Sequence, residues 1–133
     1  MLDIKNLKMN YRVQENDLAS ELPISKKDKF PKVFATSRMI AVMEIASARL
    51  MKSNLKHGEL SVGVGVNIKH IAPTLLNEEV VIEVDFIGMK DKLYEFEVKA
   101  IDNGGLIGKG THTRAIISEE RLMNGANKRK IRL

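Results

Sequence analysis

The chain has 133 residues, the length of one ordinary domain, and 44% of them are hydrophobic and 29% charged, which is typical of a globular protein rather than a disordered or fibrous one. It contains no cysteine, so disulfides, thiolate nucleophiles and cysteine-ligated zinc are excluded. The net charge of +5 lies at the two ends: residues 1–35 have seven basic against five acidic side chains, residues 119–133 have five against two, and residues 36–118 have ten of each.

The charge distribution and the composition also restrict the partners. Aromatic residues make up only 5% of the chain, too few for the stacking platforms of a nucleic-acid binder, so we expect residues 119–133 to be a solvated basic tail and expect no nucleic-acid partner. The N-terminus lacks a signal-peptide pattern, and no stretch of about 18 apolar residues occurs. The sequence therefore predicts a soluble, cytoplasmic protein without a membrane partner.

A strand and a long loop are predicted before residue 36. Apolar residues at Leu7, Met9, Tyr11 and Val13 alternate with polar ones, which predicts a half-buried strand. The alternation stops at residue 16, and the segment 16–35 is largely polar and contains two of the prolines. Because loops longer than about a dozen residues in compact domains are often functional, we interpret residues 16–35 as a lid-like loop.

The next segment predicts the principal helix. Thr36 or Ser37 can cap its start, and Arg49 and Lys52 near its end complement the helix dipole. Between residues 39 and 48 the only charged residue is Glu44, and apolar residues run almost all the way round. A helix of this kind is buried on most of its faces.

Four strands are predicted after the helix. In the first, residues 62–70 alternate, so that three valines, an isoleucine and His70 share one face, and Gly63 and Gly65 share the other with Asn67 and Lys69. Two glycines on one face indicate that a helix or ligand approaches the backbone there. Two further strands are predicted by the alternating segments before and after the turn GMKDK. The last predicted strand ends near residue 118.

This order of elements predicts the fold and the assembly. One buried helix and about five antiparallel strands indicate an α+β protein with a hot-dog fold, a curved sheet wrapped around one long helix, in a single domain over residues 1–118. Because one helix cannot cover five strands and the sheet edges remain open, we expect a homodimer paired edge to edge, or two such dimers in a tetramer.

Three residues are candidates for chemistry. An isolated carboxylate such as Glu44 in an apolar helix must be hydrogen-bonded or protonated, as catalytic acids and bases often are, or it must meet a partner such as Arg38 or Arg114. Thr36 lies eight residues earlier and can share one side of the helix with Glu44, although a threonine there is more often a cap. His70 can transfer protons at the end of its strand, or be merely structural.

The last strand carries a further polar group. His112 and Arg114 share one face of this strand with Gly108 and Gly110. Two glycines followed by an arginine can hold an anion, or the glycines can allow close packing, and the sequence favours neither. The spacing of the three histidines does not suggest a metal site, and the glycine-rich segments do not lie at strand-to-helix turns. We therefore expect no metal and no cofactor.

The chain resembles the hot-dog thioesterases related to fluoroacetyl-CoA thioesterase in three blocks, PKVFATSRMIAVMEIASARLM, GELSVGVGVNIKHIAPTLLNEEVVIEV and GKGTHTRAII. The resemblance covers residues 30–118 and implies hydrolysis of a short or small acyl-CoA thioester to a carboxylate and free CoA. It implies a catalytic group of Thr36, Glu44 and His70, in which the last two handle protons and charge. Thr36 would either attack the carbonyl or hold the water that does.

The resemblance also implies substrate-binding roles for Phe30, Gly63 and Arg114. Phe30 matches a lid aromatic over the acyl pocket, and a backbone N–H at or near Gly63 would stabilise the oxyanion. Lysines at positions 26, 27 and 29 make the loop more basic than the family pattern, so fluoroacetate specificity does not carry over. These lysines, with Arg114 and the tail, can instead meet the phosphates of CoA, although solvation is the ordinary expectation.

Two other functions on the same fold stay open at this point. A non-catalytic acyl-CoA binding or sensing module would bind the ester without turnover. A hydratase or dehydratase also uses a histidine and an acidic residue, although the signatures of those enzymes are absent from the sequence.

Overall fold

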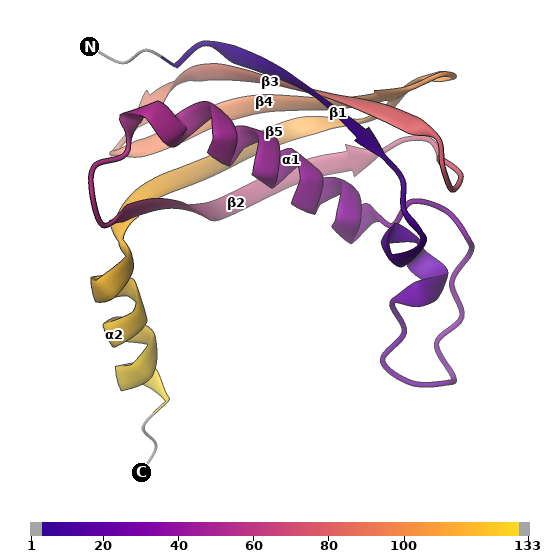
Figure 1. Cartoon of the computed structure of the whole chain (residues 1–133), viewed down its shortest axis with the longest axis horizontal. Coiled ribbons are helices and arrows are strands. Elements are labelled where there is room, and N and C mark those ends of the chain that lie inside the picture. The colour runs from indigo at the N-terminus through magenta and orange to yellow at the C-terminus, as the bar shows by residue number, and fades with distance from the viewer. Residues whose placement is uncertain (1–3, 131–133) are drawn as a thin grey trace.

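A five-stranded antiparallel sheet wraps around one long helix in the computed structural model, which describes residues 4–130 (Figure 1). The elements follow in the order β1 (Asn6–Arg12), η1 (Glu15–Asp17), η2 (Ala19–Glu21), α1 (Thr36–Met51), η3 (Lys52–Asn54), β2 (Glu59–His70), β3 (Glu79–Lys90), β4 (Leu93–Asp102), β5 (Gly105–Ser118) and α2 (Glu119–Arg129). The strand order β1-β3-β4-β5-β2 leaves β1 and β2 at the edges. The predicted α+β hot-dog fold is confirmed.

The core lies between α1 and the face of the sheet that α1 covers. The buried apolar residues of the helix follow the spacing of one helical face: Met39, Val42, Met43, Ala46 and Met51. The central strands supply alternating inward side chains: Val80, Ile82, Val84, Phe96, Val98 and Ala100. Gly108 lets the helix approach, because a Cβ there would lie 2.6 Å from the Met39 side chain. Close packing therefore accounts for this glycine of β5.

Two sequence predictions for α1 are wrong: that Glu44 is buried, and that Thr36 or Ser37 caps the helix. Ile45 is exposed and Glu44 is only partly buried, because within residues 4–130 nothing covers the side of α1 that faces away from the sheet. The N-cap is Ala35, which makes no side-chain cap hydrogen bond. Thr36 is instead the first helical residue, and its hydroxyl has a partner on β2.

The alternation predicted along β2 is interrupted by a bulge. The pairing of β2 with β5 shifts register at Val64. Gly63 pairs with Arg114 and Val66 pairs with His112, and both β5 partners are buried on the helix side of the sheet. Gly63 therefore lies on the same face of the sheet as Val66 and, by alternation, Ile68 and His70. The predicted separation of the glycines from His70 is wrong for Gly63.

The chain continues into a helix where the sequence predicts a solvated tail. Ser118 caps α2 by accepting a hydrogen bond from the backbone N–H of Arg121 at 3.3 Å. This helix buries no residue, and it projects beyond β2 on the same side as the lid-like segment, at the other end of the molecule (Figure 1). The final part of the expected tail, residues 131–133, lies outside the described residues.

Candidate active site

Thr36 and His70 meet where α1 begins and β2 ends. The Oγ1 atom of Thr36 lies 2.8 Å from Nδ1 of His70. Burial lowers the pKa of His70, with the Ala72 backbone opposing the shift, so the ring is neutral near pH 7. Its Nε2 atom is buried and has no hydrogen-bond partner among residues 4–130. A neutral imidazole with a lone pair at Nδ1 can accept the proton of the Thr36 hydroxyl.

A hollow of about 340 Å³ opens beside this pair. One wall comes from the lid-like segment through Ala19, Pro31 and Val33, and the other comes from Thr36 and residues 70–73. Most of these side chains are apolar, which suits a small acyl group. Phe30 is exposed and does not line the hollow in the described structure.

Asp17 anchors the lid-like segment. Its buried carboxylate accepts hydrogen bonds from the Tyr11 hydroxyl and from the Gln14 backbone N–H, and it lies 3.9 Å from Nε of Arg38. Its backbone carbonyl accepts the N–H of Ala35 at 2.9 Å, directly before the helix. Burial and the hydrogen bond to Asp17 raise the pKa of Tyr11 to about 12, so the phenol remains a donor. Sequence reasoning missed Asp17 because only the fold assembles these partners.

Glu44 belongs to a second polar group, which is centred on Arg114. Its Oε2 atom lies 3.4 Å from Nη1 of Arg114, one of the two partners that the sequence left open. Arg114 is 6% exposed, and it also donates from Nε to the Ser61 hydroxyl at 3.0 Å and from Nη2 to the Ser61 carbonyl at 2.9 Å. Burial lowers the pKa of Arg114 and the adjacent Glu44 opposes this shift. The carboxylate is thus paired and partly solvated, not isolated and buried.

His112 and Gly63 complete this second group. His112 is 2% exposed, and its two ring nitrogens lie 2.8 Å from the Gly65 carbonyl oxygen and 3.1 Å from Nη1 of Arg114. A Cβ at Gly63 would lie 2.5 Å from Oε2 of Glu44 and 3.3 Å from Cε1 of His112. Of the two glycines at which the sequence predicts the approach of a helix or ligand, Gly63 is met by a side chain of α1, whereas the nearest atom at Gly65 is Oγ1 of Thr113 at 3.1 Å.

Five of the six predicted site residues form two groups within one chain, and the exposed Phe30 belongs to neither. Thr36 and His70 form one group, and Glu44, Gly63 and Arg114 belong to the other. Eight residues of α-helix rise about 12 Å, so Thr36 and Glu44 lie well apart along α1. Between the two groups no hydrogen bond or ion pair occurs in the described part of the chain.

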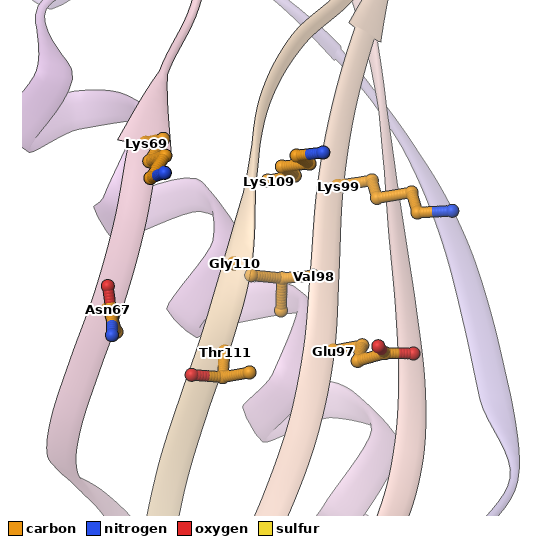
Figure 2. A pocket seen from close by; sticks show the side chains of 8 residues that line it. All are labelled: Asn67, Lys69, Glu97, Val98, Lys99, Lys109, Gly110 and Thr111. Atoms are coloured by element: carbon orange, nitrogen blue, oxygen red, sulfur yellow. The ribbon is translucent and has the colours of Figure 1, made fainter.

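Another hollow, of about 310 Å³, lies on the face of the sheet opposite to α1 (Figure 2). Lys69, Lys109 and Lys99 are direct cross-strand neighbours there, and none of them forms an ion pair within residues 4–130. Successive residues of a strand point to opposite faces, so Lys69 lies across the sheet from His70. No cluster of His, Asp or Glu side chains in the described residues could hold a metal, and no described helix is long and apolar enough to span a membrane.

Comparison with solved structures defines the class of protein. The fluoroacetyl-CoA thioesterase superposes with a TM-score of 0.89 at 30% identity, over 99% of this chain and 98% of that one. A variant of that enzyme in complex with fluoroacetate and CoA gives a TM-score of 0.85 at 29% identity, over 92% and 99% of the two chains. A thioesterase superfamily member from Thermus thermophilus, 20% identical with a TM-score of 0.84 over 97% and 93%, shares the fold. The molecule is a hot-dog protein of the thioesterase type.

Sequence comparison then identifies the family. The model of the fluoroacetyl-CoA-specific thioesterase family matches residues 13–120. The fluoroacetyl-CoA thioesterase of Streptantibioticus cattleyicolor is 36% identical over 93 residues, which are 70% of this chain and 67% of that protein. The chain therefore belongs to the fluoroacetyl-CoA-specific thioesterase family, as its resemblance to these enzymes implies.

Proposed function

We propose that this protein is an acyl-CoA thioesterase that hydrolyses a short or small acyl-CoA thioester to a carboxylate and free CoA. The observation that carries the proposal is the 2.8 Å contact between Thr36 Oγ1 and His70 Nδ1 beside a largely apolar hollow. Membership of the family supports the reaction class. Fluoroacetyl-CoA itself is not proposed as the substrate, because the lysines at positions 26, 27 and 29 depart from the family pattern.

The Thr36–His70 pair supplies the nucleophile by one of two routes. His70 takes a proton either from the Thr36 hydroxyl or from a water that this hydroxyl holds, and the oxygen attacks the thioester carbonyl. The C–S bond then breaks, and the proton on His70 goes to the leaving sulfur of CoA. In the first route water hydrolyses the acyl-threonine ester in a second step, whereas in the second route the carboxylate forms directly.

Glu44 reaches this pair from a second copy of the chain. The edge strand β2 exposes Val64 and Val66, which are 54% and 50% accessible, and the outer side of α1 exposes Ile45. A homodimer with its β2 strands paired antiparallel would cover these apolar side chains. Along β2, Gly63 lies three residues before Val66 and His70 lies four residues after it. A two-fold axis at Val66 would therefore place the Thr36–His70 group of one copy beside the Glu44–Arg114 group of the other.

The remaining predicted residues bind the substrate in this composite site, which residues from two copies of the chain would form together. A backbone N–H at or near Gly63 donates to the developing oxyanion, and Arg114 fixes the neighbouring carboxylate of Glu44 through the 3.4 Å contact. Phe30 lies on the lid-like segment, which closes over the acyl group and sets its size. The lysines of that segment attract the phosphates of CoA.

Release of free thiol from a panel of acyl-CoA esters tests the proposed activity. The wild-type protein should hydrolyse short esters, and Glu44→Ala and His70→Ala should lower kcat by roughly 10²–10⁴-fold, the usual contribution of a general base or acid. Calorimetry that shows acyl-CoA binding while the wild type and both variants release no thiol would favour the binding module instead. Loss of the ultraviolet absorbance of an enoyl-CoA without thiol release would favour a hydratase.

A further inference from the structure

We propose that His112 is a positioning residue of the active site: as a neutral, buried acceptor it holds Arg114 in the orientation that fixes Glu44. The inference deepens the proposed thioesterase function and rests on it. It starts from two contacts of one ring, at 2.8 Å to the Gly65 carbonyl oxygen and at 3.1 Å to Nη1 of Arg114.

The partners of His112 determine its tautomer. The Gly65 carbonyl can only accept a hydrogen bond, so Nδ1 of His112 carries a proton and donates. The Arg114 guanidinium can only donate, so Nε2 of His112 must be an unprotonated acceptor. Both contacts exist together only in the neutral Nδ1–H form of the ring.

The surroundings of His112 favour this neutral form. The charged groups that face it are Arg114 on its own strand and Glu44 on α1, whereas its cross-strand neighbours are Val66 on β2 and Phe96 on β4. Burial lowers the pKa of His112, the Gly65 carbonyl and Glu44 oppose the shift, and Arg114 adds to it. A protonated ring would place an imidazolium against a guanidinium and remove the acceptor.

The contact with His112 controls the one nitrogen of Arg114 that reaches Glu44. Nε and Nη2 donate to Ser61, and Nη1 divides its donors between His112 and Glu44. When the ring stops accepting, Nη1 loses its shorter contact and the guanidinium no longer has a fixed angle toward the carboxylate. The histidine therefore acts on the reaction through Arg114, without touching the substrate.

Two amide variants of the same chemical class test the inference. His112→Gln places an amide oxygen near the position of Nε2, whereas His112→Asn can still donate to the Gly65 carbonyl but is too short to reach Arg114. We expect His112→Gln to stay within about threefold of the wild-type kcat. His112→Asn should lower kcat roughly tenfold with little change in KM, because that loss corresponds to one hydrogen bond to a charged group. Equal kcat values in both variants would overturn the inference.

The pH profile provides a readout that a merely structural role would not change. On the acid side, kcat/KM of the wild type should fall with the uptake of two protons, by His70 and His112, whereas His112→Gln should show only one. Identical acid limbs would overturn the inference, and this comparison decides alone if circular dichroism shows that His112→Asn does not fold. If the wild type hydrolyses no ester, the proposed function fails. ¹⁵N NMR of the His112 ring then tests the inference separately: an Nδ1–H tautomer at neutral pH supports it, and an imidazolium overturns it.

Discussion

At the scale of single residues, the chemistry depends on which partner each polar side chain finds. The Thr36 hydroxyl contacts His70, which is distant in the sequence, instead of capping its own helix. The sequence indicates Thr36, Glu44 and His70 as candidates and leaves Arg114 open as a partner of Glu44. It does not predict that His112 accepts from Arg114, because that contact depends on the register of β5 against β2 and on the tautomer of the ring.

The activity should depend on pH through His70. Because burial lowers the pKa of His70 from its ordinary value of 6.5, the ring stays neutral and able to accept a proton at and above that pH. We therefore expect kcat/KM to be retained at pH 6.5 and to be lost only as the pH falls further. The measurement is the release of free thiol in a discontinuous assay at a series of pH values. A midpoint above 6.5 would show that a neighbouring carboxylate outweighs the burial of His70, whereas a kcat/KM that does not fall at acid pH would contradict this assignment.

Gly63 should be intolerant of a side chain for a local reason. In Gly63→Ala the new Cβ would meet Oε2 of Glu44 at 2.5 Å, and the partly solvated carboxylate would have to turn away from Arg114. We expect kcat to fall at least tenfold, since a hydrogen bond to a charged group is lost at the site. The melting temperature should fall only modestly, because Arg114 keeps its contacts with Ser61 and His112. Gly65→Ala, where the nearest atom is Oγ1 of Thr113 at 3.1 Å, is the matched control and should stay active. Similar activities in the two variants would argue against the role of Glu44.

At the scale of secondary-structure elements, local contacts change what periodicity alone predicts. Alternation predicts β3 and β4 correctly, because Val80, Ile82 and Val84 all face the helix. Alternation fails in β2, because a bulge at Val64 turns Gly63 toward Glu44, and a bulge leaves no reliable mark in the sequence. The helix α2 has a capping serine with acidic residues first and basic residues last, but its few apolar residues give no helical periodicity.

The attachment of the lid-like segment should depend on Tyr11. Tyr11→Phe removes a hydrogen bond to the buried Asp17 carboxylate, which keeps the Gln14 N–H and the more distant Arg38. We expect the free energy of unfolding, measured by urea denaturation, to fall by about 1–3 kcal/mol. Tyr94→Phe is the control, because the Tyr94 ring packs at 6.1 Å from Phe86 and its hydroxyl makes no hydrogen bond among residues 4–130. Equal losses in the two variants would show that the Asp17 contact contributes nothing.

At the scale of the whole molecule, the fold follows from the sequence more completely than the site does. The element order and the open edges predict the hot-dog sheet, since one apolar helix has only one sheet to cover. The site does not follow in the same way. Thr36 and Glu44 lie on one helix, yet their partners His70 and Arg114 lie on different strands, so one chain holds two separate groups. In the proposed homodimer a second copy would complete the site and cover the exposed apolar residues of β2 and α1.

Mixing two inactive variants tests most directly whether one composite site hydrolyses the thioester. Glu44→Ala and His70→Ala should each be inactive alone. After co-refolding in equal amounts, half of the dimers would be mixed, and each mixed dimer would hold one intact site, so about a quarter of the wild-type thiol release should return. If the mixture stays as inactive as its components while size-exclusion chromatography shows mixed dimers, Glu44 and His70 do not act together across two copies, and the proposed site is wrong.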